Sequence, residues 1–200
     1  MPVVMIDNGG ANIASVRVAF ARLGAEVSVS SDVEEIRFAD GVVLPGVGAA
    51  GDGMRRLRAS GLDEVIPRLT QPVLGVCLGM QLLFERSAEN AADCLHVMEG
   101  SVQHLQAGSD VRVPHMGWNR LRVLKNHSVF NGISDDDWFY FVHSYAAPLG
   151  NSSLASTRHG EEFCAVAGMN NFVAAQFHPE RSGRAGAQIL KNFLEWDGCN

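Results

Sequence analysis

The stretch Pro72–Phe84 changes its hydrophobic period at a single reactive residue, Cys77. The residues before Cys77 form a short, continuous apolar run, which is typical of a strand buried on both faces. The apolar positions after it fit a helix better, and Gly75 and Gly79 flank the cysteine on either side. Because glycines let the backbone turn sharply, the sequence predicts a tight strand-to-helix turn that directs the Cys77 side chain out of the sheet.

The predicted turn favours a chemical role for Cys77. The spacing repeats, with sulfur, the G-x-S-x-G turn that presents a nucleophilic serine. A helix N-terminus also favours the thiolate, because unpaired N–H groups and the helix dipole stabilise negative charge. The alternative is a buried structural cysteine, which is a frequent fate of free cysteines. We favour the nucleophile, because a core cysteine does not require two glycines at such a junction.

Strands and helices are predicted to alternate before this turn. Short apolar runs at residues 1–7 and 40–45 predict strands, as does the alternation of Val27 and Val29 with serines. An amphipathic pattern between residues 13 and 23 predicts a helix closed by a glycine. This alternation predicts an α/β fold with a mostly parallel sheet flanked by helices in flavodoxin-like layers. The length of 200 residues, with 46% hydrophobic content, predicts a single domain over residues 1–200.

The second half of the chain departs from this alternation. The pattern over residues 95–123 is irregular and β-like, and Trp138–Tyr145 is predicted to be one aromatic strand. A β-rich insertion is therefore expected before the last strand and a final helix over residues 185–196. The loop Pro114–Asn119 carries aromatic and amide side chains, which suit an interface or a site edge as well as simple packing.

The composition argues against nucleic acid and membranes as partners of this protein. The formal net charge is −6 and the chain has no long Lys/Arg stripe, so nucleic acid and anionic membranes have little electrostatic support as partners. Residues 1–7 have no basic leader and resemble neither a signal peptide nor a membrane span. The four cysteines lack the spacing of a disulfide framework or a zinc site, which favours a reducing cytoplasm. The run Asp135–Asp137 is read as a solvated loop, and no metal site is predicted.

A glycine-rich turn follows the strand at residues 40–45. Gly46–Gly51 matches G-x-G-x-x-G, but a dinucleotide site requires an acidic residue about 20 positions later, and that offset falls near Thr70 and Gln71. We therefore expect the turn to lie at the carboxyl end of a strand and to offer backbone N–H groups as an oxyanion hole facing Cys77. A merely structural turn is the alternative.

A second chemical motif lies near the end of the chain. An apolar strand leads into His178, Pro179 and Glu180, and the proline favours an extended backbone at His178. A histidine with a nearby carboxylate supplies a base and a group that orients it. A parallel sheet would bring this strand end beside Cys77, so the two motifs together predict a Cys-His-Glu triad.

With these residues, the chain resembles the class I (triad) glutamine amidotransferases over nearly its whole length. Within that family it is most similar to the glutaminase subunits of imidazole glycerol phosphate synthase. The stretches that carry the resemblance are Leu44–Gly48, Gly51–Leu57, Gly75–Gln81, Pro114–Asn119, Tyr140–Tyr145 and Gln176–Ser182. Two departures stand out: Ala49 and Ala50 replace a common His-Phe pair, and Arg181 replaces a common lysine.

The resemblance implies a reaction and a set of site residues. Cys77 would attack the side-chain amide of glutamine, His178 would carry the proton to the leaving ammonia, and Glu180 would orient His178. Water would then hydrolyse the glutamyl thioester, with no cofactor and no metal. The remaining assignments are Val47 and Leu78 as oxyanion donors, Gly48, Gln81, Ser144 and Tyr145 as glutamine-binding residues, and Trp118, Asn119, Tyr140 and Arg181 at the partner interface.

The partner implied by the resemblance is a separate (β/α)₈-barrel cyclase subunit, joined with this chain as a heterodimer. It would use the ammonia to make imidazole glycerol phosphate and an aminoimidazole carboxamide ribotide in histidine biosynthesis. Three alternatives stay open: a glutaminase that serves another ammonia acceptor, a cysteine peptidase or esterase, and a non-catalytic regulatory subunit. We also expect poor activity without the partner, because glycines around Val47 allow its peptide to rotate.

Overall fold

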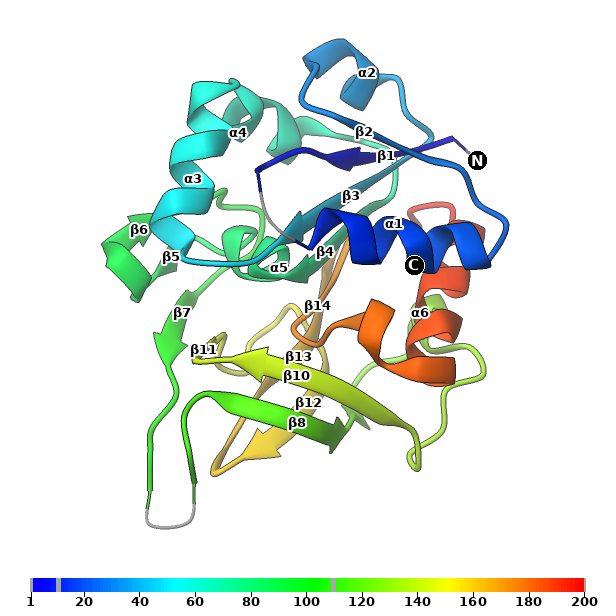
Figure 1. Ribbon diagram of the computed structural model, residues 1–200. Helices are drawn as coiled ribbons and strands as arrows, with labels where there is room; N and C mark the ends of the chain where they lie inside the picture. The colour runs from blue at the N-terminus through cyan, green and yellow to red at the C-terminus, as the bar shows by residue number, and fades with distance from the viewer. Residues whose placement is uncertain (1, 10–11, 109–110, 200) are drawn as a thin grey trace.

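A mixed sheet of eight strands runs through the protein in the order β2-β1-β3-β4-β14-β13-β12-β9 (Figure 1). The computed structural model describes residues 2–9, 12–108 and 111–199. Strands β2, β1, β3, β4 and β14 are parallel, and β13, β12 and β9 continue the sheet in antiparallel fashion. The sheet strands are β1 (Val3–Ile6), β2 (Val27–Ser30), β3 (Gly41–Gly46), β4 (Val73–Cys77), β9 (Arg122–Val123), β12 (Ser153–His159), β13 (Glu161–Met169) and β14 (Phe172–Ala175).

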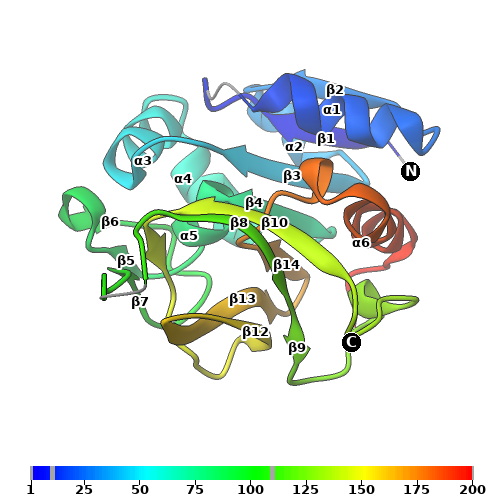
Figure 2. The same cartoon turned by 60° about the horizontal axis from the view of Figure 1, so that its bottom comes forward.

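Helices cover both faces of the sheet. The α-helices are α1 (Ile13–Arg22), α2 (Val33–Arg37), α3 (Ala50–Ala59), α4 (Leu62–Val65), α5 (Leu78–Leu82) and α6 (Gly183–Glu195), and the 3₁₀ helices are η1 (Ile66–Arg68), η2 (Glu89–Ala91), η3 (Ser128–Phe130) and η4 (Pro179–Arg181). Helices α1 and α6 lie on one face and α2–α5 on the other (Figures 1 and 2). Along β1, Val3 and Met5 join the α1/α6 core while Val4 and Ile6 join the opposite core, because successive side chains of a strand point to opposite faces. This double burial explains the continuous apolar strands.

The predicted β-rich insertion is present. Its strands are β5 (Arg86–Ser87), β6 (Ala92–Asp93), β7 (Ser101–His104), β8 (His115–Arg120), β10 (Trp138–His143) and β11 (Tyr145–Ala146). Strands β8 and β10 pair as an antiparallel ribbon (Figure 2). Phe139 and Phe141 of β10 belong to the core on the α1/α6 side of the sheet. The single strand predicted over Trp138–Tyr145 is wrong in one respect, because it divides at Ser144 into β10 and β11, which pair with different neighbours.

The carboxyl ends of three parallel strands meet at one edge. Gly46 of β3 is in register with Cys77 of β4, and Val76 is in register with Ala175 of β14. The three strands therefore end at the same level of the sheet. This brings together the glycine turn, Cys77 and the His-Pro-Glu segment, as the sequence predicts. Gly79 makes this edge tight, since a Cβ built there would overlap the carbonyl oxygen of Leu44. Only glycine allows α5 to approach β3 so closely.

Two sequence predictions reach beyond the described part of the chain. Met1 of the predicted first strand, and residues 109 and 110 of the irregular, β-like stretch over residues 95–123, lie outside the described residues. Among the helices that the structure describes, none is long and apolar enough to cross a membrane.

Candidate active site

The turn at Cys77 has the strained geometry that its glycines suggest. Strand β4 ends at Cys77, and α5 begins at Leu78. The Cys77 backbone has φ 54° and ψ −108°, a conformation that L-residues rarely adopt. Although the side chain is only 7% exposed, it reaches a cavity. The structure thus confirms the predicted strand-to-helix turn, with the sulfur presented to a pocket.

His178 and Glu180 form a buried, hydrogen-bonded pair above this turn. His178 Nδ1 lies 2.7 Å from Glu180 Oε1, and the two side chains are 4% and 1% exposed. His178 has the predicted extended backbone, while Pro179–Arg181 turn as η4 and bring the carboxylate back to the ring. Because Nδ1 donates to Glu180, Nε2 is the atom free for chemistry; it is buried and has no hydrogen-bond partner among the described residues.

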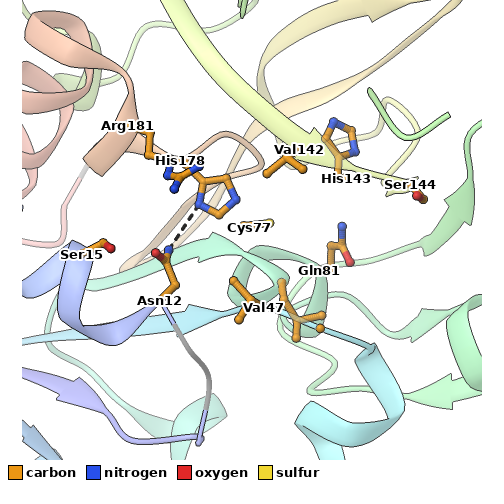
Figure 3. A pocket seen from close by; sticks show the side chains of 12 residues that line it. Asn12, Ser15, Val47, Cys77, Gln81, Val142, His143, Ser144, His178 and Arg181 are labelled. Carbon is orange, nitrogen blue, oxygen red and sulfur yellow. Dashed lines mark hydrogen bonds between the residues drawn. The ribbon is translucent and has the colours of Figure 1, made fainter. Parts of the chain in front are cut away.

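Asn12, at the start of α1, completes the support of this pair. Its Nδ2 donates to Glu180 Oε1 over 2.8 Å. The same Nδ2 lies 3.3 Å from His178 Nδ1, the contact dashed in Figure 3. Glu180 Oε2 is buried without a partner among the described residues. The main chain also holds the segment, because the His178 N–H donates to the Tyr140 carbonyl and the Tyr140 N–H donates to Ser182 Oγ.

The electrostatics of the pair favour a protonated imidazole. Burial alone would lower the pKa of His178, but its interactions with Cys77 and Glu180 outweigh burial and raise that pKa to about 10. Burial would raise the pKa of Glu180, yet its hydrogen bonds and charge interaction with His178, helped by Asn12, hold that pKa below the usual value. An imidazolium beside Cys77 can stabilise a thiolate and can later donate its proton to a leaving group.

A cavity of about 460 Å³ opens onto Cys77 and His178 (Figure 3). Its volume is typical of small-molecule sites. The residues that line it are Asn12, Ser15, Val47, Gly48, Cys77, Leu78, Gln81, Val142, His143, Ser144, His178 and Arg181. Eight of the thirteen residues expected from the sequence therefore meet in one cavity. Glu180 lies behind His178, and Tyr145 reaches the site through its backbone.

Glutamine side chains connect the cavity wall to the sulfur. Gln81 Nε2 donates to the Tyr145 carbonyl over 2.8 Å and to Gln176 Oε1 over 3.1 Å. The amide of Gln176 is thereby oriented, and its Nε2 lies 3.9 Å from Cys77 Sγ. Gln176 is fully buried in the position directly after β14.

The residues expected at a partner interface lie at the mouth of the cavity and along the β8–β10 ribbon. Trp118 is 53% exposed and its ring contacts that of Tyr140 edge-on, with centroids 5.7 Å apart. The Arg181 guanidinium lies 5.8 Å from the centre of the Tyr140 ring. Asn119 differs from these three, because its side chain hydrogen-bonds groups of this chain, including the Arg158 carbonyl.

Sequence reasoning did not assign Asn12, His143 or Gln176 to the site. Asn12 bonds to residues near the other end of the chain, so no local spacing indicates it. His143 and Gln176 stand inside motifs that carry the resemblance, next to residues that were assigned. Both are polar residues at the end of a strand, and this position was the feature of the sequence that could have assigned them to the site. No group of histidine, cysteine, aspartate and glutamate side chains within the described ranges has the arrangement of a metal site.

Comparison with known proteins decides the family. A family model described as glutamine amidotransferase class-I matches residues 4–196. This chain belongs to the class-I glutamine amidotransferase family. The amidotransferase is 49% identical over 191 residues to the imidazole glycerol phosphate synthase subunit HisH of Xanthomonas campestris pv. campestris (strain 8004), with 96% of each chain covered. It is 46% identical over 199 residues to the HisH subunit of Vibrio cholerae, covering 96% of this chain and 98% of the relative.

Solved structures agree with the amidotransferase fold. A putative GMP synthase subunit from Thermoplasma acidophilum has a TM-score of 0.74 at 22% identity, covering 98% of this chain and 93% of its own. A structure described as a glutamine amidotransferase has a TM-score of 0.74 at 20% identity, covering 96% and 97%. The predicted α/β fold and the resemblance based on motifs are both confirmed, and the chain is an enzyme of the glutamine amidotransferase class.

Proposed function

We propose that this amidotransferase is the glutaminase subunit of an imidazole glycerol phosphate synthase. It hydrolyses glutamine to glutamate and ammonia in one compact domain, and the ammonia passes to a (β/α)₈-barrel cyclase subunit in histidine biosynthesis. The observation that carries the glutaminase half is the strained Cys77 turn beside the buried His178–Glu180 pair. The HisH relatives, at 46–49% identity, support the identity of the ammonia acceptor.

The reaction begins when the Cys77 thiolate attacks the amide carbon of glutamine. The negative oxygen that forms is stabilised by the backbone N–H groups of Val47 and Leu78, which line the same cavity. The His178 imidazolium donates its proton to the leaving nitrogen, so ammonia departs and a glutamyl thioester remains. Neutral His178 then removes a proton from the water that attacks the thioester, and glutamate leaves as the Cys77 thiolate and the His178 imidazolium are restored. Glu180 holds the ring in the tautomer that each step requires.

The substrate is held by the opposite wall of the cavity. We assign glutamine binding to Gly48, Gln81, Ser144 and the Tyr145 backbone. We assign the partner interface to Arg181, which lines the cavity, and to Trp118, Asn119 and Tyr140 of the adjoining β8–β10 ribbon. The proposed compartment is a reducing cytoplasm, because all four cysteines are free and the nucleophile has to stay reduced.

Ammonia release tests this proposal most directly. Glutamate and ammonia production from glutamine is measured for the chain alone, with an empty cyclase and with a ligand-loaded cyclase. We expect slow turnover alone and a rise of about 10²–10³ with the loaded cyclase, the effect of gaining one oxyanion donor. Equal rates in all three would remove the switch, while no turnover in any would overturn the glutaminase assignment.

A labelling experiment separates the glutaminase from a cysteine peptidase or esterase. A glutamine-analogue electrophile should modify Cys77 and leave the other cysteines intact. Cys94 and Cys164 are buried, and burial raises the pKa of each thiol to about 11, whereas Cys199 is exposed and serves as the internal control. Comparable labelling of Cys199 would show that the reagent follows exposure and not a glutamine site.

A further inference from the structure

Two buried histidines that the proposed reaction does not use face each other across the β8–β10 ribbon. His115 of β8 and His143 of β10 are paired in register and are 4% and 6% exposed. His115 Nδ1 lies 3.1 Å from His143 Nε2. His143 also lines the active-site cavity (Figure 3), so the pair extends from the wall of the site toward the surface of the ribbon.

The inner end of the pair fixes the proton of His143. His143 Nδ1 lies 2.8 Å from the Tyr145 carbonyl oxygen, which can only accept a hydrogen bond. Nδ1 must therefore carry the proton. In a neutral ring Nε2 is then an acceptor, and the proton between the two histidines has to lie on His115 Nδ1.

The hydrogen bonds at the outer end of the pair require the same placement of the ring protons. Asn119 Oδ1 accepts the Arg120 N–H over 2.9 Å, and Asn119 Nδ2 donates to the Arg158 carbonyl over 2.9 Å. These backbone partners leave Nδ2 as the atom that faces His115 Nε2, at 3.4 Å. His115 Nε2 accepts and its Nδ1 donates, in agreement with the assignment made from Tyr145.

The surroundings keep both rings uncharged. His115 is stacked between His159 and Phe141, with centroid distances of 4.2 and 4.8 Å. Burial, with the neighbouring histidines adding to it, lowers the pKa of His115 to about 3. Burial also lowers the pKa of His143 to about 4, against the opposing effect of its bond to the Tyr145 carbonyl. A second proton on either ring would set two N–H groups against each other.

The carbonyl at the inner end belongs to the substrate wall. The Tyr145 oxygen accepts from His143 and, over 2.8 Å, from Gln81 Nε2. Gln81 in turn orients Gln176, whose amide reaches Cys77 Sγ. One ordered set of hydrogen bonds thus runs from Asn119 on the ribbon to the wall of the cavity and the reactive sulfur.

We propose that His115 and His143 are positioning residues, held as a neutral pair with both protons on Nδ1, which fix the Ser144–Tyr145 backbone and Gln81 for glutamine binding. This inference rests on the proposed glutaminase function. It assigns the pair an effect on how tightly glutamine is held, because neither histidine reaches the transferring proton, which His178 carries.

Nitrogen-15 NMR of the histidine rings tests the arrangement without any assay of activity. In the full-length chain near neutral pH, both rings should give the signature of neutral imidazole protonated at Nδ1, assigned by comparison with the His115→Phe and His143→Asn variants. In water the Nε2–H form normally predominates, so the expected result is distinctive. An Nε2–H ring or an imidazolium at either position would overturn the proposal.

Steady-state kinetics of the chain with its ligand-loaded cyclase test the effect of the pair on glutamine binding. His115→Phe keeps an aromatic ring between Phe141 and His159 but removes both hydrogen bonds, and should raise KM for glutamine about tenfold with kcat changed less than about threefold. His115→Asn keeps an N–H close to the place of Nδ1–H and should restore most of the KM. His159→Phe is the matched control, because His159 stacks on His115 while its Nε2 bonds the Arg112 carbonyl.

The possible results distinguish failure of the positioning role from failure of the proposed glutaminase function. An unchanged KM in His115→Phe, or an equal loss in His115→Asn, would overturn the positioning role while leaving the glutaminase standing. A wild-type chain without glutaminase activity under all conditions would overturn the proposed function and, with it, the role of the pair in binding glutamine.

Discussion

Two buried pairs, each built on a histidine, border the same cavity and have opposite electrostatics. In the His178–Glu180 pair the partner is a carboxylate, and the pKa of the histidine is raised to about 10. In the His115–His143 pair the partner is another imidazole, and the pKa values are lowered to about 3 and 4. Burial opposes the charged form in both pairs. Around His178 the interactions with Cys77 and then with Glu180 outweigh burial, whereas the neighbouring histidines around His115 and His143 add to it, so the surrounding groups decide which form survives.

The comparison explains how one cavity holds histidines in two different tasks. In the proposed reaction, the raised pKa of His178 keeps a proton ready beside Cys77 for the leaving group. A lowered pKa keeps a ring neutral, so that it donates on one side and accepts on the other. Each task would fail with the electrostatics of the other pair.

The largest effect is expected when the charged pair loses its histidine. His178→Ala should reduce kcat by about 10³ or more, since it removes the imidazole proposed to carry the proton to the leaving nitrogen. Cys77→Ala, which removes the nucleophile with little loss of volume, is the matched control and should be equally inactive. Glutamine turnover with the loaded cyclase measures both, and substantial activity in His178→Ala would assign the proton transfer to another group.

Glu180→Gln is expected to lower kcat less than His178→Ala does. The neutral amide still occupies the site but no longer favours the imidazolium, so kcat should fall by about 10–100-fold, less than in His178→Ala. The double variant should be no worse than His178→Ala alone, because the two residues act as a unit. Fully additive penalties would show that Glu180 acts independently of His178.

A change in Asn12 should modulate the charged pair without removing it. Asn12→Ala deletes one hydrogen bond to Glu180 and should lower kcat about three- to tenfold. Asn12→Asp is the sharper test, since it places a second carboxylate against Glu180 and should lower activity further at neutral pH, with partial recovery on acidification. Equal rates in wild type and both variants would remove Asn12 from the support of the pair.

The two pairs should lose their stabilising effect at opposite ends of the pH range. A lowered pKa makes the His115–His143 contribution complete above the ordinary histidine value of 6.5, and it is lost as the pH falls toward about 4. A raised pKa makes the His178 contribution complete below 6.5, and it is lost as the pH rises through about 10. Urea unfolding should therefore show a shallower acid-side decline in His115→Phe and a shallower alkaline-side decline in Glu180→Gln, each by about 1–2 kcal/mol. Identical pH profiles in wild type and both variants would contradict the assigned pKa directions.

The sequence predicted the charged pair and missed the neutral one for a physical reason. Cys77 and His178 follow strands of a parallel sheet, and the carboxyl ends of such strands meet whatever their separation along the chain. His115 and His143 meet only through the register of an antiparallel ribbon, which no pattern within either strand specifies. The tautomers depend on carbonyl positions that emerge only from the fold.

The strands of the sheet also divide into those that the sequence predicts and those that it does not. Strands β3 and β4 are continuous apolar runs and were predicted because both of their faces are buried. The β12–β13 hairpin carries small and polar residues such as Ser156 and Thr157, which are buried although their type indicates a surface. Thr157 Oγ1, for example, donates to the Arg120 carbonyl, an interaction across strands that the local sequence cannot indicate.

The backbone of Cys77 also sets a limit on how stable this protein can become. A non-glycine residue held at φ 54° and ψ −108° costs on the order of 1–3 kcal/mol, which the rest of the fold must offset. A glycine would relieve that strain, so Cys77→Gly should melt at a higher temperature than Cys77→Ala, and an equal or lower melting temperature would show that little strain is stored there. Selection for thermal stability alone would therefore act against the proposed nucleophile, and the proposed role in glutamine hydrolysis accounts for a strained residue at this turn.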